Sequence, residues 1–271
     1  FIGSYTKAQF GSNVEIKLFK YIQKLEDELE RSPPDILGMS NYAWCHRISR
    51  EMSKIFLRLN PNGIIVWGGP NFPLDLPSQE RFFSDNSVID IYVPVEGEIG
   101  FANIVKKALE VKSKDEFRNK MLEDPIDGCI TRLKNGKLQY STAPIRTKQL
   151  DEIPSPYTTG ILDEFFDGKL APMIQTNRGC PFSCTFCVDG SDLVNKINSF
   201  SNERVKEELH YIAKHVTPNM HSMHISDLNF GMYPQDLEVC ESIKEIQEKY
   251  NFPKYVKVTS GKNKKEKIIA A

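Results

Sequence analysis

Three cysteines at short, uneven spacing are the residues of this sequence best suited to chemistry. Cys180, Cys184 and Cys187 lie in the run CPFSCTFC, which has the spacing C-x3-C-x2-C. Three thiolates on one loop can hold three irons of a cubane iron–sulfur cluster, which normally takes four ligands. Because the other three cysteines lie far away in the sequence, one iron would stay open to a small molecule. The spacing therefore predicts a 4Fe-4S site with one open iron.

Zinc is the main alternative for these thiols. Structural zinc takes four nitrogen or sulfur ligands, usually as two separated pairs. A histidine could complete such a set, but none has a spacing that pairs it with the loop; the candidates are His210, His215, His221 and His224. A secreted disulfide framework would be denser and would lie in a shorter chain. The pattern therefore favours an iron–sulfur cluster.

The sequence around the cysteines predicts strands that alternate with helices. This order implies parallel strands joined by right-handed crossovers, and the ligands of open parallel sheets lie beyond the carboxyl ends of the strands. The cysteine loop follows the first predicted strand and so lies at that edge. The predicted elements are strands over 173–176, 223–226 and 255–260, a helix over 205–215 that opens at Ser201-Asn202-Glu203-Arg204, and a helix over 237–250.

The first part of the sequence has the same rhythm of strands and helices. Three of its strand ends carry polar residues or glycines, and glycine lets the backbone approach a large ligand closely. Taken singly, each could equally be an ordinary turn. The strand ends are Ser40-Asn41-Tyr42, Gly68-Gly69-Pro70 and Glu96-Gly97-Glu98. The predicted strands cover 14–19, 35–40, 64–67 and 88–93, and the helices cover 48–59 and 101–109.

The middle of the sequence changes character. A helix is predicted over 114–123, and a hairpin with a two-residue Asn135-Gly136 turn is predicted to join strands over 129–133 and 137–140. Prolines at 144, 154, 156 and 172 then indicate an ordered connector. We therefore predict a first domain over 1–112, a connector with the hairpin over 113–171, and a second domain over 172–271.

Composition restricts the class of protein. The 271 residues include 35 basic and 36 acidic side chains, a formal net charge of −1, which argues against nucleic acid bound mainly through its phosphates. No apolar run approaches the length of a membrane span, and no secretory signal opens the sequence. We expect a cytoplasmic protein without nucleic-acid or membrane partners.

Residues 176–187, TNRGCPFSCTFC, resemble the cluster-binding loop of the radical S-adenosylmethionine (SAM) superfamily. This resemblance implies that Cys180, Cys184 and Cys187 hold the cluster and that SAM binds its open iron. Reduction of the cluster would then cleave SAM and start radical chemistry. Many relatives carry a second acidic residue where this sequence has Leu228, so no role is implied for that position. The further SAM contacts implied are Phe186 against the adenine, and Asp227, Asn229 and Ser260 at strand ends.

The three strand ends of the first region together resemble the cobalamin-binding domain of cobalamin-dependent radical SAM enzymes. The resemblance implies an α/β protein, with a doubly wound, flavodoxin-like cobalamin-binding domain followed by the first part of a radical SAM (βα) partial barrel. Because the sequence has no Asp-x-His-x-x-Gly motif, we expect no cobalt ligand from such a motif, and His46 is expected to be a helix-start residue. The implied cobalamin contacts are Ser40, Asn41, Tyr42, Gly68, Gly69, Pro70, Glu96, Gly97 and Glu98.

The expected function is therefore reductive SAM cleavage at a 4Fe-4S cluster, followed by radical chemistry with cobalamin. Methyl transfer to an unactivated atom and other radical steps such as cyclisation both remain open, as do a small-molecule and a peptide substrate. The resemblance also implies an electron donor such as flavodoxin or ferredoxin. The alternatives are a radical SAM enzyme that does not use cobalamin and a non-catalytic iron–sulfur binding module. We also expect a piece of a longer protein, because the first strand of one domain and the last strands of the other are missing.

Overall fold

The structure is a computed structural model that describes residues 1–141, 145–261, 263 and 265–270. The chain divides into two compact units. The N-terminal unit comprises Ile2 and Ser4–Arg146, and the C-terminal unit comprises Phe1, Gly3 and Thr147–Ala271. We therefore find the division between Arg146 and Thr147. The expected connector over 113–171 is shared between the two units, and its Pro144 lies outside the described residues.

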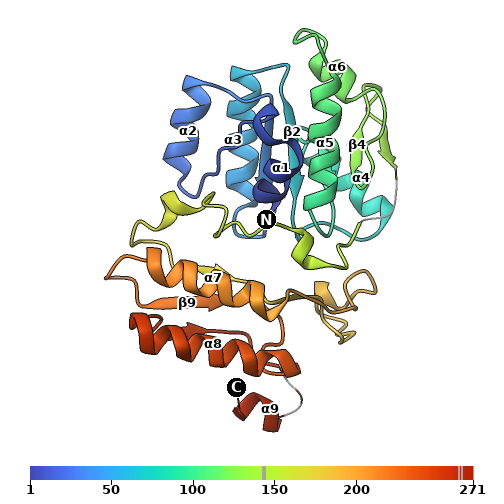
Figure 1. The fold of residues 1–271 in the computed structure, drawn as a ribbon. Coiled ribbons are helices and arrows are strands. Elements are labelled where there is room, and N and C mark those ends of the chain that lie inside the picture. The colour runs from blue at the N-terminus through green and yellow to red at the C-terminus, as the bar shows by residue number, and fades with distance from the viewer. Residues whose placement is uncertain (142–144, 262, 264, 271) are drawn as a thin grey trace. The chain divides into compact units, whose positions relative to one another are not determined.

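The N-terminal unit is built on one mixed sheet with the strand order β1-β2-β3-β4-β5 (Figure 1). Its first three strands are parallel, and their register places Ser40 beside Gly68 and Gly68 beside Val93. Their carboxyl ends therefore meet at one edge. The last two strands are antiparallel additions. The strands are β1 (Ile36–Ser40), β2 (Ile64–Gly68), β3 (Ile91–Val93), β4 (Ile130–Arg132) and β5 (Leu138–Tyr140).

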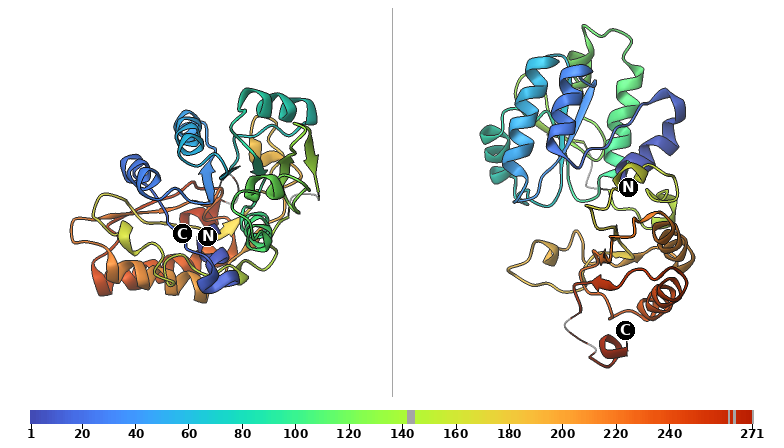
Figure 2. Two further views of the ribbon diagram at one scale, coloured as in Figure 1. Left: turned by 90° about the horizontal axis from the view of Figure 1, so that it is seen from above. Right: turned by 90° about the vertical axis from the view of Figure 1, so that its left-hand side faces the viewer.

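Helices cover both faces of this sheet because side chains alternate along each buried strand. Ile65 and Trp67 face one core with α2, α3 and α4, whereas Ile64 and Val66 face a second core with α5 and α6. Figure 2 shows helices on both sides of the sheet. The unit is doubly wound, as expected. Its helices are α1 (Ile2–Phe10), η1 (Gly11–Asn13), α2 (Ile22–Arg31), α3 (His46–Leu59), α4 (Leu76–Asp85), α5 (Glu98–Glu110) and α6 (Phe117–Met121).

Two local predictions for this unit are wrong. Residues 14–19 were expected to form a strand but belong to none of the described strands. Their alternation reflects burial of one side of the segment, and alternation alone does not supply a strand to pair with. The hairpin has a three-residue loop rather than a two-residue one: Leu133 donates to the Lys137 carbonyl and accepts from Gly136. A type I′ turn needs two residues with positive φ, and here Gly136 (φ 79°) adopts one while Asn135 does not.

The C-terminal unit alternates strands and helices as expected, with a parallel three-stranded sheet in the order β10-β9-β6. Two of its strands are shorter than predicted, and α8 starts three residues earlier than predicted, whereas α7 opens at Ser201 as predicted. Helix α7 starts after Ser201, whose side chain accepts from the Arg204 amide. The elements are η2 (Leu150–Glu152), η3 (Asp163–Phe165), β6 (Met173–Ile174), β7 (Asn177–Arg178), η4 (Val188–Gly190), β8 (Asn198–Ser199), α7 (Asn202–His215), β9 (Ser222–Ile225), α8 (Pro234–Tyr250), β10 (Tyr255–Lys257) and α9 (Lys265–Ala270).

This unit has its own buried core, formed where the two long helices pack together and against the sheet. Leu209 and Ile212 of α7, Ile246 of α8 and Met223 of β9 are all fully buried. None of the helices in the described part of the chain combines the length and apolar character needed to cross a membrane.

Candidate functional site

A hydrogen-bond network joins the strand ends at the carboxyl edge of the N-terminal sheet, and Asn41 is its centre. The Asn41 side chain is fully buried. Its amide nitrogen donates to the Asn71 carbonyl at 2.5 Å and to the Tyr92 hydroxyl at 3.2 Å. The Tyr92 hydroxyl in turn donates to the Gly69 carbonyl at 2.7 Å. Asn41 therefore fastens β1, β2 and β3 together at this edge.

The backbone conformation and packing at position 69 require glycine, independently of any ligand. Its φ is 126°, a conformation that L side chains rarely adopt, and a Cβ placed on it would lie 2.8 Å from the Asn41 carbonyl oxygen. The close approach that glycine permits here is thus between two chain segments. A side chain at Gly69 would displace Asn41 before it could affect any ligand.

His46 supports the same edge from the start of α3. Its Nδ1 lies 2.9 Å from the Asn41 side-chain oxygen, and its ring makes T-shaped contacts with Trp67 and Phe82 at centroid distances of 5.3 and 6.0 Å. These contacts give His46 a positioning role at the base of the edge. They agree with its expected place at a helix start.

The structure brings most of the expected cobalamin contacts to this edge. Ser40 and Gly68 end neighbouring strands. Tyr42 stacks on Trp44, with the ring centroids 4.7 Å apart, and Trp44 is 79% exposed. Trp44 was not among the expected contacts, although it lies within two residues of the predicted run.

The third strand end, which follows β3, contains an uncommon backbone conformation. Val95 has a φ of 63°, and this region is unusual for a β-branched residue. Glu96 accepts from the Arg146 guanidinium at 3.0 Å, a Cβ on Gly97 would meet the Ile2 side chain, and Glu98 is buried in the first turn of α5. These contacts are all within the N-terminal unit.

In the C-terminal unit, a short antiparallel ladder closes the base of the cysteine loop. Strands β7 and β8 pair Asn177 with Ser199 and Arg178 with Asn198. Inside this ladder, the Cys180 amide donates to the Val194 carbonyl at 3.0 Å. Gly179 permits the close approach, because a Cβ on it would lie 2.3 Å from the Lys196 carbonyl oxygen. The first cysteine is therefore carried on a fixed base.

The other two cysteines lie on the outer part of the loop. Cys184 is half-exposed and Cys187 is exposed, and the Cys187 amide donates to the Cys184 carbonyl at 3.0 Å. Phe186 between them is 83% exposed. All six cysteines are free.

Three free thiols on one accessible loop suit an iron–sulfur cluster by their chemistry. Among the described residues, however, no three histidine, cysteine, aspartate or glutamate side chains are gathered as a metal site.

Asp227 lies beyond β9 and fastens the segment that leads into this loop. One carboxylate oxygen accepts from the Thr176 and Asn177 amides at 2.8 and 3.3 Å. The other accepts from the Asn177 side chain at 2.8 Å and from the Thr176 hydroxyl. The side chain is 2% exposed, and burial raises the pKa of Asp227 to about 6. The expected SAM contact is thus a carboxylate engaged in holding two strands together.

Asn229 and Ser260 lie at the same edge as Asp227. Asn229 is 5% exposed, and its side-chain nitrogen donates to the Cys180 sulfur at 3.3 Å. Ser260 is exposed and pairs with Phe230 in a parallel bridge. The structure therefore brings Asp227, Asn229 and Ser260 together around the base of the loop.

A second buried carboxylate, which was not among the expected site residues, lies next to these residues. Asp236 is fully buried in the first turn of α8 and accepts from the Gly231 and Tyr233 amides at 2.8 and 2.9 Å. Burial raises the pKa of Tyr233 to about 12, and the charges of Cys180 and Asp236 act in the same direction. The missed signal was an acidic residue just after Pro234, which is typical of a helix start.

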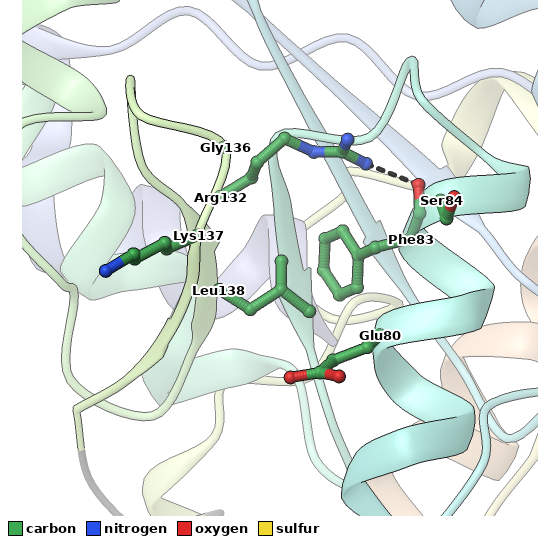
Figure 3. A pocket seen from close by; sticks show the side chains of 7 residues that line it. All are labelled: Glu80, Phe83, Ser84, Arg132, Gly136, Lys137 and Leu138. Atoms are coloured by element: carbon green, nitrogen blue, oxygen red, sulfur yellow. Dashed lines mark hydrogen bonds between the residues drawn. The ribbon is translucent and has the colours of Figure 1, made fainter.

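A separate hollow of about 540 Å³ lies between α4 and the β4–β5 hairpin (Figure 3). The Arg132 guanidinium above it donates to the Phe83 carbonyl at 2.6 Å and also to the Asn86 carbonyl, so it caps the end of α4. None of the expected site residues lines this hollow. Its lining residues are Glu80, Phe83, Ser84, Arg132, Gly136, Lys137 and Leu138.

Comparison with known proteins identifies similar chains, although no protein-family model matches. The cobalamin-dependent radical SAM methyltransferase TokK from Streptomyces tokunonensis is 28% identical over 258 residues, which cover 92% of this chain and 35% of TokK. A 2-(S-pantetheinyl)-carbapenam-3-carboxylate methyltransferase from Streptantibioticus cattleyicolor is 28% identical over 248 residues, or 87% of this chain and 33% of that protein. This chain resembles the cobalamin-dependent radical SAM methyltransferases over most of its length.

Solved structures show the same fold. The cobalamin-dependent SAM radical enzyme OxsB, with aqua-cobalamin and SAM bound, matches with a TM-score of 0.59 and 22% identity over 83% of this chain and 31% of OxsB. The methyltransferase TsrM from Kitasatospora setae, with cobalamin and a [4Fe-4S] cluster bound, matches with a TM-score of 0.58 and 15% identity over 93% of this chain and 50% of TsrM.

The comparisons confirm the family resemblance and the α/β fold class that the motifs predicted. The chain spans about a third of the length of the curated relatives that it matches. The individual cofactor contacts stay predictions for this chain.

Proposed function

We propose that this chain is part of a radical SAM enzyme of methyltransferase type, with a 4Fe-4S cluster, SAM and cobalamin as its cofactors. The observation that carries the proposal is the cysteine loop in its setting. A C-x3-C-x2-C loop, closed at its base by β7 and β8, lies at the carboxyl edge of a parallel sheet, where Asn229 contacts Cys180. The similarity to named methyltransferases supports the same conclusion.

Each part of the C-terminal unit has a definite task in this proposal. Cys180, Cys184 and Cys187 bind the cluster, while Asp227 keeps the base of their loop in register with β9. Phe186 and Ser260 contact SAM. When bound, the cluster supplies the electron for reductive SAM cleavage, which the protein receives from a donor such as flavodoxin or ferredoxin in the cytoplasm. The protein would also have to exclude water from the cluster and SAM, so that the radical chemistry reaches the substrate alone.

The N-terminal unit holds cobalamin at the edge organised by Asn41. The expected contacts from Ser40 to Tyr42, from Gly68 to Pro70 and from Glu96 to Glu98 provide the backbone and side-chain surface. When bound, cobalamin supplies the methyl group that is transferred. Because Asn41 donates to the Asn71 carbonyl beyond β2 and the Gly69 carbonyl accepts from Tyr92 of β3, they act in cobalamin binding as rigid supports. His46 is a further support and not a cobalt ligand in this proposal.

The first experiment tests the cluster. The protein is reconstituted with iron and sulfide without oxygen, and iron content and visible absorption are measured. Alanine at Cys180, Cys184 or Cys187 should abolish the cluster absorption, whereas alanine at Cys45 or Cys240, which are equally free and partly exposed, should preserve it. Full iron content in a triple variant that lacks the three loop cysteines would refute the cluster assignment.

Two further measurements separate the alternatives. Cobalamin binding by the reconstituted protein, followed by absorption, distinguishes the proposed enzyme from a radical SAM enzyme without cobalamin. Reductive SAM cleavage by the full-length protein distinguishes an enzyme from a non-catalytic iron–sulfur module. Cluster formation without SAM cleavage in the full-length protein would support that module instead.

A further inference from the structure

Asn229 makes the side-chain contact that links the end of β9 to a cluster cysteine. We propose that the Asn229 amide is a positioning residue that raises the reduction potential of the cluster through its hydrogen bond to the Cys180 sulfur. The inference rests on the proposed cluster and adds a function that the loop motif does not contain.

The geometry of this contact is well defined by its surroundings. The Asn229 nitrogen lies 3.3 Å from the Cys180 sulfur, although the two residues are 49 positions apart. Both partners are held independently. On one side, the Cys180 amide is bonded to the Val194 carbonyl. On the other, the Phe230 amide next to Asn229 donates to the Thr259 carbonyl at 3.0 Å. The contact therefore does not depend on the outer part of the cysteine loop.

Burial makes this hydrogen bond effective. Asn229 is 5% exposed, so water competes little for its amide. A cysteine that ligates iron is a thiolate, which accepts hydrogen bonds and donates none. Of the two ends of the asparagine side chain, only the nitrogen can donate, so the amide nitrogen must face the sulfur when the cluster is bound.

The expected effect on the cluster follows from charge. One-electron reduction adds a negative charge that is spread over the irons and their sulfur ligands. A hydrogen-bond donor at a sulfur stabilises the reduced cluster more than the oxidised one, and hydrogen bonds to sulfur are among the features that set the potentials of iron–sulfur clusters. Removing the donor should therefore shift the midpoint potential to a more negative value.

The test compares the wild type with two variants and a matched control. Asn229→Leu keeps a similar size but removes the donor, and Asn229→Asp replaces the donor with a carboxylate. Asn195→Leu is the control, because Asn195 lies on the same loop but donates to the Asp192 carboxylate. Each protein is reconstituted without oxygen, and the midpoint potential is measured by electron paramagnetic resonance during a dithionite titration.

We expect the potential to fall in Asn229→Leu, to fall further in Asn229→Asp, and to stay at the wild-type value in Asn195→Leu. A merely structural Asn229 would lower iron content while leaving the potential of the remaining clusters unchanged, and that result would overturn the inference. A wild-type protein that binds no cluster would refute the proposed function, and this inference with it. Unchanged potentials in cluster-loaded variants would refute this inference alone.

A second measurement covers the case in which both Asn229 variants lose the cluster. The wild-type protein is labelled with nitrogen-15 in its asparagine side chains, and nuclear coupling to the reduced cluster is recorded by pulsed paramagnetic resonance. The hydrogen bond predicts a coupled nitrogen-15 that persists in Asn195→Leu. Absence of any such coupling in the wild type would overturn the proposal.

Discussion

At the scale of single residues, two buried polar side chains, Asn41 and Asp227, play the same part in their respective units. Each follows a strand, is almost completely buried, and bonds to the ends of neighbouring strands. Both were expected to contact cofactors. Their polar atoms hold together the backbone that carries the other candidate contacts, because a buried polar group must find hydrogen-bond partners within the protein, and their own cofactor contacts stay predictions.

Asp227 should make the C-terminal unit less stable as pH rises. Its pKa is raised from 3.8 to about 6, so between these values the folded unit keeps a proton that the unfolded chain has lost. The contribution of Asp227 to the free energy of unfolding is therefore greatest below pH 4. It falls as pH rises through 6, by roughly 3 kcal/mol for about two pKa units. Hydrogen exchange of the β6 and β9 amides from pH 4 to 7.5, corrected for intrinsic exchange rates, measures this loss of stability.

The control is Asp227→Asn, which has no titrating group at this position. The variant should be less stable throughout, because its amide nitrogen faces other donors, but it should lack the fall between pH 4 and 7. Wild-type protection that rises over this range would contradict the prediction.

Val95 and Asn251 form a natural pair for testing backbone strain. Both have positive φ, at 63° and 56°, but asparagine tolerates this region far better than a β-branched residue does. Val95→Asn should raise the free energy of unfolding of the N-terminal unit by about 1 kcal/mol. Asn251→Val should lower that of the C-terminal unit by about 1–2 kcal/mol. Denaturant titrations give both values, and effects of the same sign would contradict the explanation.

At the scale of elements, the β7–β8 ladder determines where the cysteine loop begins. The ladder has only two residue pairs, so its stability depends on the close approach at Gly179. The outer loop has little regular structure beyond η4. The ladder therefore fixes Cys180 at the base of the loop, while Cys184 and Cys187 lie beyond the ladder.

Gly179→Ala should disrupt this ladder, because the added Cβ would lie 2.3 Å from one carbonyl oxygen and 2.8 Å from another. We expect faster hydrogen exchange at β8 and reduced iron content after reconstitution. The matched control is Gly136→Ala in the other hairpin, where φ is 79° and nothing lies within 4 Å of the added Cβ. That variant should lose only about 1 kcal/mol from backbone strain. Equal iron content in the two variants would show that the ladder does not position the loop.

At the scale of the whole molecule, the chain forms two units that each bury a core of their own. In the N-terminal unit, Phe56 and Trp67 lie in the core between α2, α3, α4 and the sheet. In the C-terminal unit, Met223 and Ile246 are fully buried. Stability is therefore best measured unit by unit rather than as one value for the chain.

Substitutions that shorten a core side chain should destabilise only the unit that contains it. Phe56→Ala should lower the free energy of unfolding of the N-terminal unit by about 3–5 kcal/mol, and Ile246→Ala should lower that of the C-terminal unit by about 2–5 kcal/mol. Hydrogen exchange resolved by peptide should locate each loss within its own unit. Equal loss of protection in both units from either substitution would show a single cooperative domain.

The sequence alone determined the family resemblance, the α/β class and the order of most elements. Cysteine spacing and the alternation of apolar residues are local properties, so they can be read without knowing which segments meet. For the same reason the sequence could not show that residues 14–19 lack a strand partner, or that the hairpin loop has three residues. It also left the cofactor roles of Asp227 and Gly69 untested.

Only the tertiary structure decided which side chains meet. Asp227 reaches Thr176 across 51 positions, Asn229 reaches Cys180 across 49, and Asn41 reaches Tyr92 across 51. No local pattern encodes these pairs, because parallel strands are joined by crossover connections of a dozen or more residues, so their ends meet only in the folded sheet. The chemistry proposed for the loop therefore follows from its cysteines. The hydrogen bonds that hold those cysteines in place follow from the tertiary structure.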